Sequence, residues 1–267
     1  MEDAINLYGF KLSKKLVKFM LNGEEKINHK KIHSFRLSIK RLSVLLKLLF
    51  LLSEKKKSTD LLLPFNEVYK SSGRYRNKHI QRQIINAYES EFPRDVKLLI
   101  KQLKVEEKNA ASKLTDSLKK VNHKAIRKAI KCISDSVKVG SEKITFEKCI
   151  EYINSEVEII TQISARRIDE KALHKLRKQI KGVVYSLELL NNSIKLSHFY
   201  KNVYEVANIL QDELGQLNDR SMLLKSIRKL YAKSLTYNGL EWVLGVDVTM
   251  RRTQIVKRLA EAQYAIS

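Results

Sequence analysis

Apolar side chains recur at intervals of three and four residues along almost the whole chain, which is the period of an α-helix packed on one face. No stretch shows the strict alternation of a β-strand, and only 8 glycines and 2 prolines interrupt the 267 residues. The pattern therefore predicts an all-α protein. We expect helices at residues 4–21, 29–52, 59–71, 76–90, 94–121, 123–138, 144–167, 169–191, 197–213, 219–236 and 239–263.

Glycine and proline predict the turns between these helices. We place turns at Asn22-Gly23, Ser71-Ser72-Gly73, Phe92-Pro93, Val139-Gly140-Ser141 and Asn238-Gly239.

Two predicted helices carry the same polar pattern, His-x-x-Arg-x-x-x-Lys, as HSFRLSIK (33–40) and HKLRKQIK (174–181). At 100° per residue, each set of cations falls in a strip about 60° wide. We call His33, Arg36, Lys40 and Lys47 the first stripe, and His174, Arg177 and Lys181 the second stripe. On the opposite side of these helices lie the expected core residues Phe35, Ile39, Leu42, Leu45, Leu46, Leu49, Leu176, Ile180, Val183 and Leu187.

The two stripes point to an anionic ligand. Cations one helical turn apart repel each other by a few tenths of a kcal/mol per pair, and neither stripe contains a carboxylate. Arginine can donate two parallel hydrogen bonds to phosphate oxygens, lysine supplies a point charge, and histidine donates one hydrogen bond. An extended polyanion lying along the helices would make this arrangement favourable. A solvated helix face is the alternative for either stripe alone, and the recurrence of the pattern argues against it.

The repeat extends beyond the stripes. Gly73 and Arg76-Asn77 follow the first stripe, and Gly215 and Asn218-Asp219 follow the second, each 142 residues further along the chain. We interpret this as an internal duplication within a single domain, 1–267, with an N-terminal half at 1–140 and a C-terminal half at 141–267.

The chain carries 52 Lys and Arg against 29 Asp and Glu, a net charge of +23, and most of the excess lies in residues 1–140. Such an excess destabilises a compact fold by self-repulsion, so it favours a polyanionic partner: nucleic acid, an acidic membrane surface or a phosphate polymer. Solubility alone is the alternative explanation. Outside the stripes, we select Lys14, Lys18, Arg76 and Arg82 as further candidates for the cationic surface, and assign Lys55, Lys56 and Lys57 to solubility.

Cys132 and Cys149 form no CxxC motif, and isolated cysteines suit a reducing compartment. The N-terminus lacks the pattern of a secretory signal, and the longest apolar run, 44–52, is broken by Lys47 and too short to cross a bilayer. We therefore expect a cytoplasmic protein with no membrane span.

The doubled motif, together with LGQLND at 214–219, Tyr185 and Glu188, resembles the CHAD family, the conserved histidine α-helical domain, over residues 4–260. The resemblance implies two pseudo-symmetric four-helix bundles and a basic surface where the two stripe helices meet. It also implies that this surface binds inorganic polyphosphate. By position, the ligand-facing residues would be His33, Arg36, Lys40, Arg41, His174, Arg177 and Lys181.

The chain departs from the family pattern in four places. Ser43, Gly182 and Val184 stand where further basic residues are usual, and Asn77 stands in place of an aspartate. We expect these changes to weaken the second-half site or to shift the path of the anion. By helical angle, Lys175 and Lys178 point away from the second stripe.

We predict non-catalytic binding of polyphosphate, with no cofactor and no metal ion, and association with polyphosphate granules or with a polyphosphate-metabolising enzyme. Affinity should fall as salt rises, and protonation of His33 and His174 near pH 6 should tighten binding. Sequence-independent nucleic-acid binding is the first alternative, although no zinc finger or RNA-recognition signature is present. A metal-dependent phosphohydrolase is less favoured because the two stripe histidines are too few for a closed zinc site. A helical adaptor that binds acidic proteins or membranes is the third alternative.

Overall fold

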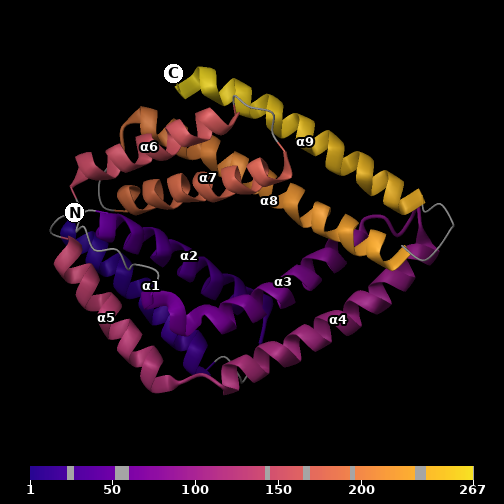
Figure 1. Ribbon diagram of the computed structural model, residues 1–267, viewed down its shortest axis with the longest axis horizontal. Helices are drawn as coiled ribbons and strands as arrows, with labels where there is room; N and C mark the ends of the chain where they lie inside the picture. Colours follow the sequence, from indigo (N-terminus) through magenta and orange to yellow (C-terminus); the bar gives the residue numbers. More distant parts are fainter. Residues whose placement is uncertain are drawn as a thin grey trace.

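The fold is known from a computed structural model that describes residues 1–22, 27–51, 60–141, 145–164, 169–192, 196–231 and 239–266 (Figure 1). These residues form helices joined by short turns and contain no β-strand, so the all-α prediction is confirmed for this part of the chain. The elements are α1 (Glu2–Asn22), α2 (His29–Leu51), the 3-10 helix η1 (Asp60–Phe65), α3 (Asn66–Asn86), α4 (Pro93–Lys119), α5 (His123–Ser141), α6 (Phe146–Ser164), α7 (Glu170–Asn191), α8 (His198–Tyr231) and α9 (Gly239–Ile266).

The helices form two groups that meet along α2 and α7. In Figure 1, α1 to α5 occupy the lower part of the molecule and α6 to α9 the upper part. Helix α2 contacts α7, and α3 contacts α8, so the two stripe helices lie side by side at the junction of the groups. This arrangement places both stripes in the middle of the molecule rather than on two separate outer faces.

The predicted turn at Gly73 is wrong because α3 continues through it, and the gap expected between helices at residues 214–218 is wrong because α8 runs through Gly215. Helix α5 includes Gly140 and ends at Ser141, the last residue of the turn predicted there. A Cβ on Gly73 would lie 2.7 Å from Nη1 of Arg36, and one on Gly140 would lie 2.5 Å from a methyl group of Leu49. These two glycines therefore permit close packing against α2 rather than a change in chain direction.

Other boundaries match the prediction. Helix α4 begins at Pro93, as expected for a proline at the first helical position. The turn residues Gly23 and Asn238, the segment Lys55–Lys57 and the predicted helical residues 165–167 and 232–236 lie outside the described residues.

The core confirms the apolar faces assigned to the stripe helices. All ten of the expected core residues are buried, none with more than 7% of its surface exposed. The larger core cluster includes residues from both halves of the chain, such as Leu42 and Leu187. A second cluster, which includes Leu99, Leu223 and Leu244, joins α4 to α8 and α9. Both clusters therefore bridge the two halves.

The order of helices agrees with the predicted duplication in part. Helices α1 to α4 and α6 to α9 can be matched in order, with the stripe helix second in each series, but α5 has no counterpart among the described helices of the second half. The duplication and the boundary near residue 140 stay predictions. Within the described residues, no helix combines the length and the apolar character needed to cross a membrane.

Candidate anion-binding groove

The two stripes face a common groove of about 760 Å³ between the two groups of helices. Its walls come from α2, η1, α3, α6, α7 and α8. The cationic side chains that line it are Arg36, Lys40, Lys47, Arg76, His174, Arg177, Lys178 and Lys181. The carboxylates among its lining residues are Glu156 and Asp219. Residues predicted from two distant motifs thus share one concave, positively charged surface.

Matching N-terminal caps fix where the two stripe helices begin. The side chain of Asn28 accepts a hydrogen bond from the Lys31 amide at 2.8 Å, and that of Asp169 accepts one from the Ala172 amide at 2.7 Å. Each cap satisfies a backbone amide that the helix leaves unpaired. Each cap also precedes the stripe histidine by five residues. Both stripes therefore begin at the same distance from the N-terminal cap of their helices, and the local sequence alone sets this distance.

Lys40 and Lys181 are partly buried lysines of the groove, and the nearby Asp219 carboxylate offsets their charges only in part. Neither forms a hydrogen bond or an ion pair with any described residue. Burial, and then the charge of Arg36, lowers the pKa of Lys40 to about 8. Burial, and then the charges of Arg177 and Lys40, lowers the pKa of Lys181 to about 7. The shifts mean that the free groove disfavours the protonated form of both side chains.

Arg36 is held against α3. Its Nη1 donates to the carbonyl oxygen of Tyr69 at 2.5 Å and to Oγ of Ser72 at 3.3 Å, and its guanidinium lies 4.3 Å from the centre of the Tyr69 ring. Burial is the main cause that lowers the Arg36 pKa. The side chain is thereby fixed at the groove wall, with Gly73 beneath it.

Arg177 is the corresponding residue of the second stripe, and it is less well satisfied. Its Nε is buried and has no hydrogen-bond partner among the described residues. Burial lowers its pKa, while the nearby carboxylate of Asp219 raises it and Arg76 lowers it. An unpaired buried N–H is unfavourable unless a ligand or water accepts from it.

Two predicted ligand residues have protein partners. Arg41 forms a bidentate ion pair with Glu188 of α7, in which its Nε donates to Oε2 at 2.8 Å. Lys47 donates to Oε1 of Glu156 at 2.7 Å and to the Tyr152 hydroxyl at 3.0 Å. Burial alone would lower the pKa of Lys47, but these two bonds raise it above the ordinary lysine value. These pairs tie α2 to α7 and to α6.

The remaining candidates are spread more widely. His33 is exposed beside the groove, and burial and the charge of Arg76 lower its pKa. Burial and the charge of Lys178 lower the pKa of His174. Lys14 and Lys18 are exposed on α1 and do not line the groove. Arg82 pairs with Glu107 at 2.8 Å, also away from the groove.

The helical angles did not anticipate several groove residues. Lys178 was expected to point away from the second stripe, yet it lines the groove. Tyr69, Tyr152 and Glu156 belong to the site because α3 packs beside α2 and α6 packs beside α7, and no spacing in the sequence signals that packing. A second pocket of about 610 Å³, between α7, α8 and α9, shares His174, Arg177 and Asn218 with the groove and so extends it.

The chain is similar to a known protein family and to a solved structure. Residues 14–228 match the family model of the CHAD domain. The fold is similar to the crystal structure of the CHAD domain from the plant Ricinus communis, with a TM-score of 0.66 and 14% sequence identity over 98% of this chain and 87% of that chain. Among curated protein sequences, the comparison found no match.

Proposed function

The chain belongs to the CHAD domain family, and from the charge and shape of its groove we propose that it binds inorganic polyphosphate there without catalysing a reaction. The polymer would lie between the two stripes, with its oxygens accepting hydrogen bonds from Lys40, Lys181 and Arg177. Association with polyphosphate granules, or with an enzyme that handles polyphosphate, would follow from the same contact.

The main support for the proposal is a set of partly buried groove cations that form no ion pair in the described structure. Lys40 and Lys181 form no hydrogen bond or ion pair in the described structure, although the charge of Asp219 acts on both from a distance. Arg177 has an unpaired Nε, and each of the three cations lowers the pKa of at least one neighbour. Surface charges that serve solubility would point into water, where they need no partner. Partly buried cations that repel one another are favourable only when an anion enters between them.

The size of the groove supports an extended ligand over a single phosphate ion. The cations that line it come from α2, α3 and α7, and the second pocket continues past His174 and Arg177. One phosphate group could contact only some of these side chains. A polymer with about one negative charge per phosphate unit could neutralise them in succession, releasing its counterions as it does so.

The aromatic side chains favour a ligand without bases. Phe65, Tyr69, Tyr152 and Tyr185 line the groove. Phe65 is buried, and Arg36, Lys47 and Arg41 lie over the rings of Tyr69, Tyr152 and Tyr185. Single-stranded nucleic acid gains much of its affinity by stacking bases on open aromatic rings. The groove offers phosphate contacts and little stacking surface.

The test is a calorimetric titration of the full chain with long-chain polyphosphate at two salt concentrations, repeated with double-stranded DNA. We expect tighter binding of polyphosphate than of DNA, and a fall in affinity as salt rises. We expect Lys40→Ala/Lys181→Ala to weaken polyphosphate binding by at least about 100-fold, because each of the two charge-assisted hydrogen bonds contributes about 1.5–3 kcal/mol.

Lys97→Ala/Lys101→Ala is the matched control, since it removes two exposed charges from α4, away from the groove. Equal weakening in both double variants would mean that net charge alone attracts the polymer and would contradict the proposal. Equal affinity for DNA and polyphosphate would favour the nucleic-acid alternative. Release of free phosphate from the bound polymer would contradict the non-catalytic part of the proposal.

A further inference from the structure

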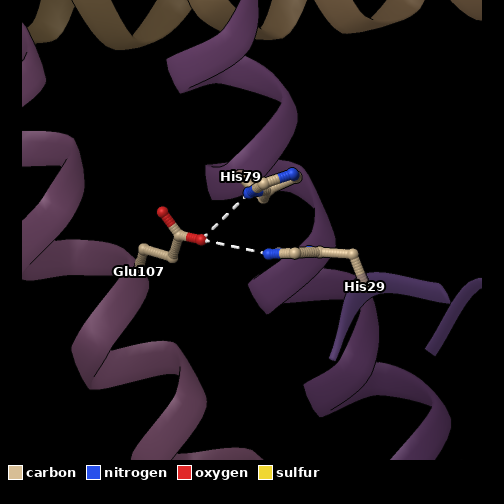
Figure 2. Close-up of side chains that lie close together, drawn as sticks. All are labelled: His29, His79 and Glu107. Carbon is tan, nitrogen blue, oxygen red and sulfur yellow. Dashed lines mark hydrogen bonds and ion pairs between the residues drawn. The ribbon is translucent and has the colours of Figure 1, made fainter. Parts of the chain in front are cut away.

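A cluster of metal-ligating side chains lies away from the groove, where α2, α3 and α4 meet (Figure 2). His29 is the first residue of α2, His79 lies in α3 and Glu107 lies in α4. Oε1 of Glu107 is 3.1 Å from Nδ1 of His79 and 3.6 Å from Nε2 of His29. These three ligand atoms all lie within 4.8 Å of one another.

The two distances from Oε1 of Glu107, 3.1 and 3.6 Å, are close to those between ligands that share one ion. Two ligands on a tetrahedral ion, with bonds of about 2.0–2.1 Å, are separated by about 3.3 Å. Two imidazoles and one carboxylate form a ligand set that suits Zn²⁺ and similar ions, whereas Mg²⁺ and Ca²⁺ prefer oxygen ligands throughout. We propose that His29, His79 and Glu107 bind one divalent transition-metal ion, with Zn²⁺ as the representative.

Neighbouring side chains hold the three ligands in place. Nε of Arg82 donates to Oε2 of Glu107 at 2.8 Å, which orients the carboxylate and leaves Oε1 directed toward the two histidines. The His29 ring is stacked on that of His79, with centres 3.2 Å apart and planes 21° apart. Figure 2 shows Nε2 of His29 and Nδ1 of His79 both directed toward Glu107. Because the two rings are nearly parallel, they must turn apart by a large angle before both nitrogen lone pairs point at one ion, so ion binding requires the stack to open.

The site is accessible from solvent but not fully exposed. The His29 side chain is 37% exposed, that of His79 18% and that of Glu107 12%. An ion can therefore enter beside His29, and a water molecule can complete its coordination. The Tyr75 hydroxyl, which lies 3.0 Å from Nε2 of His29, would have to turn away when the ion binds.

The positive charge of Arg82 restricts which metal ions can bind at this site. It opposes a second cation near Glu107, so an ion held mainly by charge, such as Mg²⁺, gains too little to bind. An ion that bonds strongly to imidazole nitrogen can overcome this repulsion. Once bound, it would link the start of α2 to α3 and α4 and so stabilise this junction.

The competing account is a plain polar network, in which His79 and Arg82 both donate to Glu107 and no ion binds. The two accounts differ in what Zn²⁺ and Co²⁺ do to the chain. A metal site predicts binding of one ion per chain, visible Co²⁺ absorption typical of low-coordinate nitrogen and oxygen ligands, and a Tm that rises with Zn²⁺ concentration. A polar network predicts none of these.

The experiment is a titration of the full, chelator-treated chain with Zn²⁺ by calorimetry and with Co²⁺ by visible absorption. His29→Gln and His79→Gln should each reduce metal affinity by at least about 10-fold, because each removes a direct ligand. Without metal, both variants should retain the helical circular dichroism of the parent chain. Glu107→Gln serves as a third variant, and the two histidine variants decide the question if it fails to fold beside Arg82.

His123→Gln is the matched control, because His123 is an exposed histidine at the start of α5, away from the cluster. It should leave affinity and the Co²⁺ spectrum unchanged. The proposal is overturned if neither ion binds at one per chain, or if His79→Gln binds Zn²⁺ as tightly as the parent. It is also overturned if Co²⁺ gives the intense near-ultraviolet band of a thiolate ligand, because the ion would then sit at Cys132 or Cys149.

Discussion

The guanidinium of Arg36 occupies the space that a side chain at position 73 would fill: a Cβ on Gly73 would lie 2.7 Å from Nη1 of Arg36. The second half contains the corresponding pair with more room, because a Cβ on Gly215 would have Nη2 of Arg177 at 3.9 Å as its nearest neighbour. The two glycines therefore occupy matching positions but differ in how closely the stripe arginine approaches.

The difference predicts unequal outcomes for two alanine substitutions. Gly215→Ala should stabilise the chain by about 0.5–1 kcal/mol, because alanine is the better helix former and the space is available. Gly73→Ala should gain less, since the new methyl group displaces Arg36 from the Tyr69 carbonyl. It should also weaken polyphosphate binding by about 1 kcal/mol through lost preorganisation. Thermal unfolding and calorimetry check both; equal stabilisation by the two alanines would contradict the argument.

The Arg41–Glu188 pair predicts a loss of stability when one partner is neutralised. Both side chains are about four-fifths buried, and the pair joins α2 to α7. Glu188→Gln should lower the free energy of unfolding by about 1–3 kcal/mol, because it leaves the Arg41 charge without its partner. A double-mutant cycle with Arg41→Gln should show coupling of similar size in chemical denaturation.

The control for that cycle is Glu170→Gln. Glu170 pairs with Lys225, but the two side chains are 72% and 61% exposed. An ion pair this exposed contributes less than about 1 kcal/mol. A loss of stability as large as that of Glu188→Gln would show that general charge balance, rather than the buried pair, is responsible.

The lowered lysine pKa values predict that the chain takes up protons when polyphosphate binds. With pKa values of about 7 for Lys181 and about 8 for Lys40, both are partly neutral in the free chain at pH 8. A polyanion favours the charged form and raises both pKa values, so binding at pH 8 should take up about one proton per chain. Calorimetry in two buffers of different ionisation enthalpy measures this number. No uptake at pH 8 would mean that neither lysine meets the polymer.

The same shift predicts that the free chain is more stable without the Lys181 charge. The folded-state pKa of about 7 lies below the unfolded value of 10.5, so the unfolded chain binds more protons between these pH values. Stability should therefore rise from pH 7 toward pH 10, while the destabilisation is fully present below pH 7. Lys181→Met should raise stability at pH 7 by about 1 kcal/mol, or roughly 2–4 °C in Tm. An unchanged Tm and an unchanged pH profile would contradict this.

The histidines predict a second, more acidic pH dependence. Burial and neighbouring cations lower the pKa of both His33 and His174, so their added charge appears at a lower pH than an ordinary histidine would give. Polyphosphate affinity should rise as the pH falls from 6.5 to 5, a range in which both groove lysines are mostly or fully charged. The rise should be smaller in His33→Gln/His174→Gln; an identical rise would remove the histidines from the binding site.

The sequence by itself determined the helical character of the chain, the buried faces of the stripe helices and the two stripes. The three- and four-residue period fixes which side chains share a face, so Leu42 and Leu187 could be assigned to the core and Lys40 and Lys181 to one line of charge. The caps Asn28 and Asp169 are local too, since each acts within its own first turn. These features depend on neighbours a few residues away, which the sequence displays.

Only the tertiary structure decided which charges have partners. Arg41 meets Glu188, 147 residues away, and Lys47 meets Glu156, 109 residues away. Two candidates therefore have protein partners, while Lys40 and Lys181 form no hydrogen bond or ion pair with a described residue. Gly73 predicts a turn by composition, yet it lies inside α3, where its lack of a side chain leaves room for the guanidinium of Arg36. His29, His79 and Glu107 come together from three helices with no shared spacing. Such contacts depend on how whole helices pack against one another. The three- and four-residue spacing of side chains shows which residues share a helix face, but not which other helix that face meets.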